Sequence, residues 1–474
     1  MTHSMHRQGT YDNLSDDFVL LGVAGGAFED LPATFRQFDA IAIRHQPVEV
    51  PATQLTSAHH FVYDAKEKIR SLLTDLAVAE LGISVTISGL RDQVTECCRA
   101  AELNPHTVCQ SLGFWGKTER LPHFRALEVS TMCGHGRVSP NLVWDLAKEV
   151  QRQALDSNEA SKRMNELCRC QIFNSARAAK LTAKLAADIE AGIVSFPQSH
   201  TKADITPNKD FGITIDEAKC IGCMDCLPYC PVSAIIESST NGIVSIDAER
   251  CTECGVCLQS EVCPVEAIVG EGLTWPRTLR GKFHSLHSPY RAAPTLAQTT
   301  KLSTDNQIFA SKQISTELTS DVTGCYNHGE VEIKVELGRP HLGITFRDVQ
   351  KVIQALIPVG LNLEHQYPPL DGRSPLTDLT IDVNKGILRP EILDQKTGWV
   401  PLKLEVPEDK VLEALKNLRQ VTTEIDTIFA VDIISLAAKD GSSAADRLAD
   451  KIGTEPACNC KTNVGLGRPL AVLQ

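Results

Sequence analysis

Two cysteine runs, CIGCMDCLPYCP at residues 220–231 and CTECGVCLQSEVCP at residues 251–264, form the most informative stretch of the chain. Each run holds three cysteines, two residues apart, and then a fourth cysteine directly before a proline. In chain order these cysteines are Cys220, Cys223, Cys226, Cys230, Cys251, Cys254, Cys257 and Cys263. Three thiolates on one tight loop can bind three iron corners of a cubane, while the fourth ligand comes from elsewhere. The spacing therefore predicts two [4Fe–4S] clusters.

Where two such clusters lie together, the cysteine before the proline crosses to the other cluster. We therefore expect one cluster on the first three cysteines of the first run and Cys263. The other cluster takes the first three cysteines of the second run and Cys230. The alternative is a structural zinc ribbon, since Cys-x2-Cys pairs also bind zinc. Zinc would need two pairs, whereas this sequence has two triplets that are each followed by Cys-Pro.

Residues 213–270 resemble a bacterial-type ferredoxin domain with two [4Fe–4S] clusters. Besides the runs themselves, the resemblance rests on the flanking pairs Ile215-Asp216, Ala234-Ile235, Ile246-Asp247 and Ala267-Ile268. It implies short strands and helices around each cluster loop and the transfer of single electrons. The gap before Cys263 is two residues longer than the gap before Cys230, so the shape of that loop stays open.

Composition restricts the function further. The chain has 474 residues, 17 cysteines and a formal net charge of −12, and its length suits about three domains. The negative charge and the 5% of aromatic residues argue against nucleic acid as a partner. Because cluster thiolates must stay reduced, and because the N-terminus lacks an apolar signal segment, we expect a cytoplasmic protein. The longest early apolar run is too short to predict a membrane span.

We expect a multidomain α/β protein. The N-terminal α/β domain would have a largely parallel sheet with a helical extension, and the C-terminal domain would be an α+β ferredoxin-like sandwich, a term that describes topology only. The expected boundaries are 1–17 for a disordered tail, 18–195 for a cysteine-rich α/β domain, 196–212 for a linker, 213–270 for the ferredoxin domain, 271–300 for a basic linker and 301–474 for the sandwich.

Hydrophobic periodicity predicts the elements on both sides of the cysteine runs. Before the runs it predicts strands at 18–23, 83–87, 106–112 and 127–131, and helices at 62–81, 90–101, 139–155, 158–167 and 174–191. After the runs it predicts strands at 331–337, 361–365, 379–383, 400–406 and 427–434, and helices at 345–357 and 407–418. The alternation of strands and helices in the first half favours parallel pairing.

A third metal site is a further candidate, which would add a third iron–sulfur cluster. Cys133 follows an expected strand and precedes glycines, and Cys168 and Cys170 form a Cys-x-Cys pair at the end of a helix. Cys109 or His135 would complete the ligand set. The alternative is a group of separate buried thiols, which are common in protein cores.

Three weaker features lie outside these sites. Glycines at 22, 25 and 26 end the first expected strand and could cradle a phosphate or a flavin, although a tight turn is the default and no flavin is assigned. Cys458 and Cys460 could cap a metal site or act in redox exchange, although an exposed tail is the default. The corners Gly338-Arg339-Pro340 and Gly467-Arg468-Pro469 could face one anionic group.

Two further segments, ITFRDV at 344–349 and KTNVGLGRP at 461–469, resemble parts of the 6-hydroxynicotinate reductase-like proteins. This resemblance implies ferredoxin-linked reduction of a small organic substrate, and it assigns no catalytic residue. We predict an iron–sulfur oxidoreductase or its subunit, which relays low-potential electrons to a site in the N-terminal domain or to a redox partner protein. The alternatives are a pure electron-transfer subunit without an active site, and a redox or effector sensor.

Overall fold

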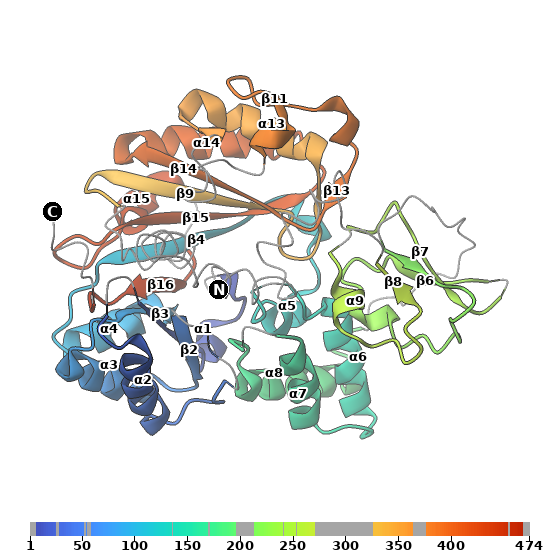
Figure 1. The fold of residues 1–474 in the computed structure, drawn as a ribbon, viewed down its shortest axis with the longest axis horizontal. Helices are drawn as coiled ribbons and strands as arrows, with labels where there is room; N and C mark the ends of the chain where they lie inside the picture. The colour runs from blue at the N-terminus through green and yellow to red at the C-terminus, as the bar shows by residue number, and fades with distance from the viewer. Residues whose placement is uncertain are drawn as a thin grey trace.

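The computed structural model shows one large sheet with helices on both faces (Figure 1). It describes residues 6–24, 28–51, 54, 58–134, 136–168, 171–195, 213–239, 241–252, 254–270, 326–363, 376–453 and 456–467. Outside them lie the expected linkers at 196–212 and 271–300, and also Gly25, Gly26, His135, Cys170, Cys325, Arg468 and Pro469. Across the described ranges, no helix is both long enough and apolar enough to span a bilayer.

Eight strands form the sheet, and every pair in it is antiparallel. The strands are β1 (Phe18–Val23), β2 (Ala58–Tyr63), β3 (Ser84–Leu90), β4 (Thr107–Gly116), β9 (Glu330–Leu337), β14 (Val400–Pro407), β15 (Ile428–Leu436) and β16 (Asn459–Asn463). Their order is β14-β9-β15-β4-β16-β3-β1-β2. Strands from the two halves of the chain therefore interleave, since β4 pairs with β15 on one side and β16 on the other.

This order overturns two expectations. The N-terminal strands do not form a parallel sheet, and the C-terminal strands do not form a sandwich of their own. Strand–helix alternation occurs in both parallel and antiparallel folds, and the pairing partner decides between them. The partner that β3 and β4 share is β16, which comes near the end of the chain. The expected domain boundaries stay predictions.

Two groups of helices cover one face of the sheet, one group on the N-terminal strands and one on the C-terminal strands. Helices α2 (Leu31–Arg44), α3 (Lys66–Ala79) and α4 (Arg91–Ala100) pack on the N-terminal strands, and helices α13 (Phe346–Leu356), α14 (Val411–Val421) and α15 (Ala444–Ile452) pack on the C-terminal strands. The strand register places both cores on the same face, because Ile433 pairs with Gln110, which pairs in turn with Cys460. The apolar stripes of these helices account for the burial.

The opposite face carries a helical bundle and a layer of charged side chains. The bundle consists of α5 (Phe124–Ser130), α6 (Pro140–Gln151), α7 (Ser157–Leu167) and α8 (Ser175–Glu190), and it packs on Val19 and Val62. Side-chain caps begin the last three helices at Ser139, Asp156 and Asn174. Helix α5 replaces the strand expected at 127–131, because its residues pack among the other helices of the bundle.

The N-terminal segment is folded, so the expected disordered tail at 1–17 is wrong for residues 6–17. Helix α1 (Tyr11–Leu14) follows Arg7, which is buried with Asp17 and Arg177. The Asp17 carboxylate accepts hydrogen bonds from both guanidinium groups. A segment that looks disordered in the sequence is therefore held in the fold by a buried ionic network.

Two smaller differences concern element boundaries. The helix expected at 62–81 begins only at Lys66, since residues 58–63 form β2. Residues 361–363 are not a strand, and 364–365 lie outside the described residues. Short pairs complete the body: β10 (Ile344–Thr345) with β13 (Lys396–Thr397), and β11 (Thr380–Asp382) with β12 (Ile387–Leu388). Single 3-10 turns are η2 (Thr118–Arg120), η4 (Ile357–Val359), η6 (Thr377–Leu379), η7 (Pro390–Ile392) and η8 (Glu408–Lys410).

Residues 213–270, here named the cysteine module, form a lobe beside α6 (Figure 1). Its elements are β5 (Thr214–Ile215), η3 (Leu227–Tyr229), β6 (Ile235–Glu237), β7 (Val244–Ile246), α9 (Val256–Gln259) and β8 (Ile268–Val269). β5 pairs with β8, and β6 pairs with β7. The module has its own apolar core, which includes cysteines of both runs.

Candidate functional site

The first cysteine loop begins at Asp216, directly after β5. The Asp216 carboxylate accepts the backbone N–H of Ala218 at 3.1 Å, and its carbonyl accepts the N–H of Cys220 at 3.0 Å. This turn aims the loop at a cavity with mostly apolar walls, which include Ile215, Ile221 and Val244. The cysteines that line this first cavity are Cys220, Cys223, Cys226 and Cys263.

The second loop repeats the arrangement after β7. The Asp247 carboxylate accepts the backbone N–H of Glu249 at 2.8 Å, and its carbonyl accepts the N–H of Cys251 at 2.9 Å. The loop then curves around a second cavity, which Ile213 and Ile235 also line. The cysteines of this second cavity are Cys230, Cys251, Cys254 and Cys257.

Each cavity thus gathers three cysteines of one run and the cysteine before proline of the other. The sulfur of each crossing cysteine accepts a backbone N–H: Ala234 donates to Cys230 Sγ at 3.1 Å, and Ala267 donates to Cys263 Sγ at 3.2 Å. Hydrogen bonds of this kind stabilise negative charge on sulfur and tune cluster potentials. Four converging sulfurs in an apolar pocket fit a [4Fe–4S] cluster, although the individual ligands stay a prediction.

The electrostatics of the thiols also fit a metal cluster. Burial raises the pKa of Cys226 to about 12 and that of Cys254 to about 11, and the neighbouring cysteines add to both shifts. The pKa of Cys257 lies well above its usual value for the same reason. Four thiolates cannot share such a pocket without a compensating positive charge, and a coordinated metal supplies that charge.

The second cavity lies on the side of the module that meets the body. The Asn141 side chain, at the start of α6, donates to the carbonyl of Cys230 at 2.7 Å and to Ser233 Oγ at 2.9 Å. Arg137 donates to the side chain of Gln259 in α9, and Lys396 donates to the carbonyl of Glu249. These contacts join the second cysteine quartet to the bundle and to the β10–β13 pair.

A turn at residues 338–343 completes this contact. Gly343 lies against the side chain of Thr252, next to Cys251. The Arg339 guanidinium donates to the carbonyl of Gly134 and lies 4.6 Å from the centroid of the Trp399 ring. The sequence marked the Gly-Arg-Pro corner at 338–340, and the structure places it between β9 and the module. The second such corner lies largely outside the described residues.

The candidates for a third metal site are only partly described. Cys133 and Cys168 are buried in the core of the bundle, whereas Cys109 packs against Ile434 on the sheet. Cys170 and His135 lie outside the described residues. Burial holds the pKa of Cys109 well above its usual value. The third cluster stays a prediction.

Two other expectations are now clearer. A Cβ at position 22 would overlap the ring of Phe38. The packing of Phe38 therefore explains the glycine at this position. The expected exposed tail is wrong for Cys460, which is fully buried in β16, while Cys458 is exposed. β16 is buried because it lies between β3 and β4.

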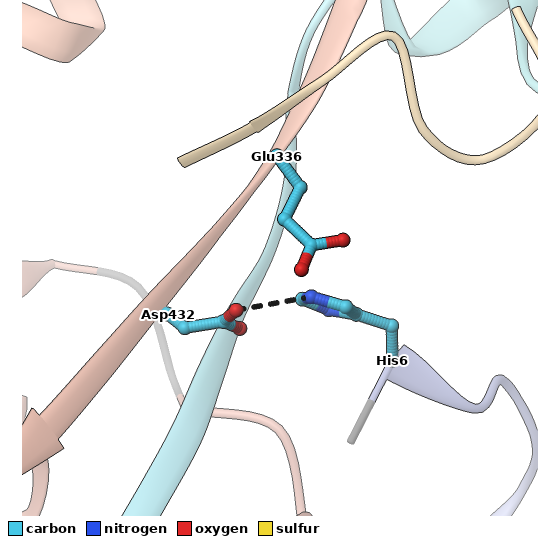
Figure 2. Close-up of side chains that lie close together, drawn as sticks. All are labelled: His6, Glu336 and Asp432. Atoms are coloured by element: carbon cyan, nitrogen blue, oxygen red, sulfur yellow. Dashed lines mark hydrogen bonds and ion pairs between the residues drawn. The ribbon is translucent and has the colours of Figure 1, made fainter. Parts of the chain in front are cut away.

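Sequence reasoning missed the charged layer on the sheet. Alternating apolar and charged residues, as in β9, are typical of a half-exposed strand, yet Glu332, Lys334 and Glu336 are all buried. Glu336 lies beside Asp432 of β15 and His6 of the N-terminal segment (Figure 2), and Lys334 pairs with Asp432 in the strand register. The alternation was visible, but nothing local in the sequence shows that the partners lie in distant segments.

Comparisons with known proteins give a family match over a segment that overlaps the cysteine module. Residues 206–267 match the 4Fe-4S dicluster domain family. Pyruvate synthase subunit PorD of Methanocaldococcus jannaschii is 35% identical over 78 residues, which is 16% of this chain and 87% of that subunit. The PorD subunit of Methanothermobacter marburgensis is 35% identical over 75 residues, which is 16% of this chain and 84% of that subunit.

A third relative is a larger protein, which belongs to the ion-translocating oxidoreductase complex of Methanosarcina acetivorans. It is 44% identical over 52 residues, which is 11% of this chain and 18% of the relative. No solved structure matches the chain. Each of these relatives matches 16% of the chain or less, so the similarities describe only a small part of it.

Proposed function

The chain belongs, through residues 206–267, to the ferredoxin-type 4Fe-4S dicluster family, and on this premise we propose that it is an iron–sulfur oxidoreductase or the electron-transfer subunit of one. The observation that carries the proposal is the pair of cysteine quartets, each gathered around its own cavity. A [4Fe–4S] cluster in such a pocket accepts and releases one electron at a time.

The chain's own residues prepare the pockets for this chemistry. The apolar walls exclude water, and the N–H groups of Ala234 and Ala267 stabilise charge on the crossing sulfurs. Asp216 and Asp247 hold the two loops in matching turns. Because the same devices occur twice, we propose that Cys220, Cys223, Cys226 and Cys263 ligate one cluster, and Cys251, Cys254, Cys257 and Cys230 the other.

We propose a direction for the electrons. Cys223 of the first quartet is exposed to solvent, where a donor protein can approach. The second quartet is joined to the body through Asn141, Gln259 and Thr252. Electrons would arrive at the first quartet and leave from the second, toward the turn at 338–343 and the sheet behind it.

A redox partner protein is part of the proposal. All three relatives are subunits of named enzymes or complexes, two of a pyruvate synthase and one of an ion-translocating oxidoreductase complex. By analogy, this chain would exchange electrons with another protein in a reducing compartment such as the cytoplasm. The large body would then hold a substrate site or a partner's docking surface, and a small organic substrate is the favoured reactant.

The experiment is anaerobic purification followed by analysis of iron, acid-labile sulfide and flavin. We expect about eight iron and eight sulfide per chain, and about twelve of each if the third cluster exists. Reduced protein should give the electron paramagnetic resonance (EPR) spectrum of two interacting clusters. Bound zinc in place of iron, after anaerobic reconstitution, would overturn the proposal.

Matched cysteine variants test the ligand assignment. Cys263→Ser should disturb the cluster of the first quartet, and Cys230→Ser that of the second, because each crosses between runs. Cys460→Ser is the control, since this buried cysteine lies in β16 far along the chain from both runs. If Cys133→Ser keeps the full iron content, the third cluster is wrong.

Coupled activity separates the alternatives. A pure electron-transfer subunit would pass electrons to a partner and show no substrate reduction by itself. A sensor would change its partner binding with redox state and show no turnover. A chain that reduces an organic substrate with a chemical donor alone would be a self-contained enzyme.

A further inference from the structure

A second group of metal-ligating side chains lies on the sheet, outside the cysteine module. It consists of His6 from the N-terminal segment, Glu336 near the end of β9 and Asp432 in the middle of β15 (Figure 2). One potential ligand atom of each residue lies within 4.8 Å of the other two. Among the described residues, no other three His, Cys, Asp or Glu side chains bring their ligand atoms this close together.

The strand register explains why the carboxylates meet. Asp432 pairs with Lys334 on β9 and with Ser111 on β4, so its side chain shares a face with Glu336, two residues along β9. Adjacent same-face positions on paired strands bring side chains within reach of each other. His6 then approaches from the N-terminal segment, which the Arg7–Asp17–Arg177 network anchors.

The histidine is oriented for ligation. Its Nδ1 lies 3.0 Å from Ser111 Oγ, and its Nε2 lies 3.1 Å from Asp432 Oδ2. Metal-binding histidines commonly hold one ring nitrogen with a hydrogen bond while the other faces the ion. Two ligands about 2.1 Å from one ion lie roughly 3 to 3.5 Å apart, and the His6–Asp432 distance is already of that size.

Asp432 provides an independent observation that points to a ligand. It is fully buried, and its Oδ1 has no hydrogen-bond partner in the part of the chain that the structure describes. A buried carboxylate oxygen without a partner costs folding free energy. The side chain points into the group together with Glu336 and the His6 ring (Figure 2).

Lysines around the group set its charge. Lys334 donates to Glu336, and Lys403 lies 3.7 Å from Glu332. Lys334 can hold one oxygen of the Glu336 carboxylate while the other binds an ion.

We propose that His6, Glu336 and Asp432 form a binding site for a first-row divalent cation. One imidazole and two carboxylates match the preferences of Mn²⁺, Fe²⁺ and Zn²⁺, whereas Mg²⁺ and Ca²⁺ prefer oxygen ligands alone and Cu⁺ prefers sulfur. The site goes beyond the proposed electron transfer and does not depend on it. Its place on β9, shortly before the turn at 338–343, puts a Lewis acid on the strand that leads to the second quartet.

The test uses Mn²⁺, because thiolates of the cysteine module prefer softer metals. Full-length protein, purified anaerobically and treated with a chelator, is titrated with Mn²⁺, and the EPR signal of the free ion is followed. We expect one tightly bound Mn²⁺ per chain. Asp432→Asn should weaken binding at least about a hundredfold, and Ser111→Ala about tenfold, as expected for a ligand and for its orienting partner.

His45→Ala is the matched control, since His45 Nε2 also lies 3.0 Å from an aspartate, Asp75. This variant should bind Mn²⁺ like the wild type. Circular dichroism checks the fold of each variant, and Ser111→Ala keeps every charge if Asp432→Asn does not fold. The proposal is overturned if the wild type binds no Mn²⁺, if Ser111→Ala and Asp432→Asn bind it unchanged, or if His45→Ala loses it equally.

Discussion

The side-chain amide of Asn141 donates to the backbone carbonyl of Cys230 at 2.7 Å, and so joins the first turn of α6 to a cysteine of the second quartet. The same amide reaches Ser233 Oγ at 2.9 Å. This residue therefore connects the body to the module, at the point where α6 approaches the second cavity.

Asn141→Ala should therefore loosen the module. Loss of the amide removes two hydrogen bonds to part-buried acceptors, each worth about 0.5–1.5 kcal/mol. We expect hydrogen exchange at residues 227–237 to rise at least about fivefold, measured by mass spectrometry. Asn158→Ala is the control, because Asn158 is exposed in the first turn of α7. Equal exchange in the two variants would contradict this role of Asn141.

A second prediction concerns the contact between Gly343 and Thr252. Gly343 has a φ of +67°, and a Cβ there would overlap the Thr252 side chain and, less severely, the carbonyl oxygen of Thr397. Gly441 has a similar φ of +84° but nothing within 4 Å of its would-be Cβ. Both Ala variants carry the same kind of backbone strain, so their difference measures the overlap alone.

We expect Gly343→Ala to lower the free energy of unfolding by about 1–3 kcal/mol more than Gly441→Ala does. Chemical denaturation measures the difference, and limited proteolysis should cut the Gly343→Ala module faster. If the two variants have equal stability, the turn at 338–343 does not depend on Thr252.

The cysteine quartets could be predicted because their cause is local. Cluster geometry requires fixed spacing within a short loop, and the turns at Asp216 and Asp247 are encoded directly before the cysteines. The helices α6 to α8 were predictable for a similar reason, since Ser139, Asp156 and Asn174 cap them.

The sheet was not predictable, because its pairing is non-local. Cys460 looked like part of a tail, yet β16 fills the gap between β3 and β4. The charges of β9 looked half-exposed, because an alternating strand gives the same pattern whether its polar face meets water or a buried ionic layer. The two cases differ only in whether residues from distant segments, here His6 and Asp432, pack against the polar face.

Acid should weaken the protein through His341. Burial, together with the Arg339 guanidinium, lowers the pKa of His341 to about 3. The unfolded chain binds a proton on this ring below about pH 6.5, while the folded chain does not. The contribution of the neutral His341 to the free energy of unfolding is therefore fully present above that pH, and it is lost as the pH falls from 6.5 toward 3.

His341→Asn tests this, because asparagine tolerates the positive φ of 65° at this position. Between pH 7 and pH 5, we expect the free energy of unfolding of the wild type to fall by about 1–2 kcal/mol more than that of the variant. This magnitude allows for screening of the half-buried ring by solvent. Urea denaturation at each pH measures the loss. Near pH 8 the difference in unfolding free energy between the two proteins should no longer change with pH. If this difference stays constant down to pH 5, the prediction is contradicted.

The last prediction concerns the buried aspartate that holds the N-terminal segment. Asp17 accepts hydrogen bonds from Arg7 and, at 2.9 Å, from Arg177, and all three side chains are almost fully buried. Asp17→Asn keeps the shape but leaves two guanidinium groups without their counter-charge. Breaking a buried ion pair in this way costs about 3–5 kcal/mol.

The neighbouring residue is a matched control, because Asp16 pairs with Lys180 at 2.8 Å on the surface. Asp16→Asn should cost less than about 1 kcal/mol. Guanidinium chloride denaturation compares the two variants, and proteolysis of residues 6–17 should accelerate in Asp17→Asn alone. Since this network also positions His6, Asp17→Asn should weaken Mn²⁺ binding while Asp16→Asn leaves it unchanged. Equal effects of the two variants would show that the segment is held by other contacts.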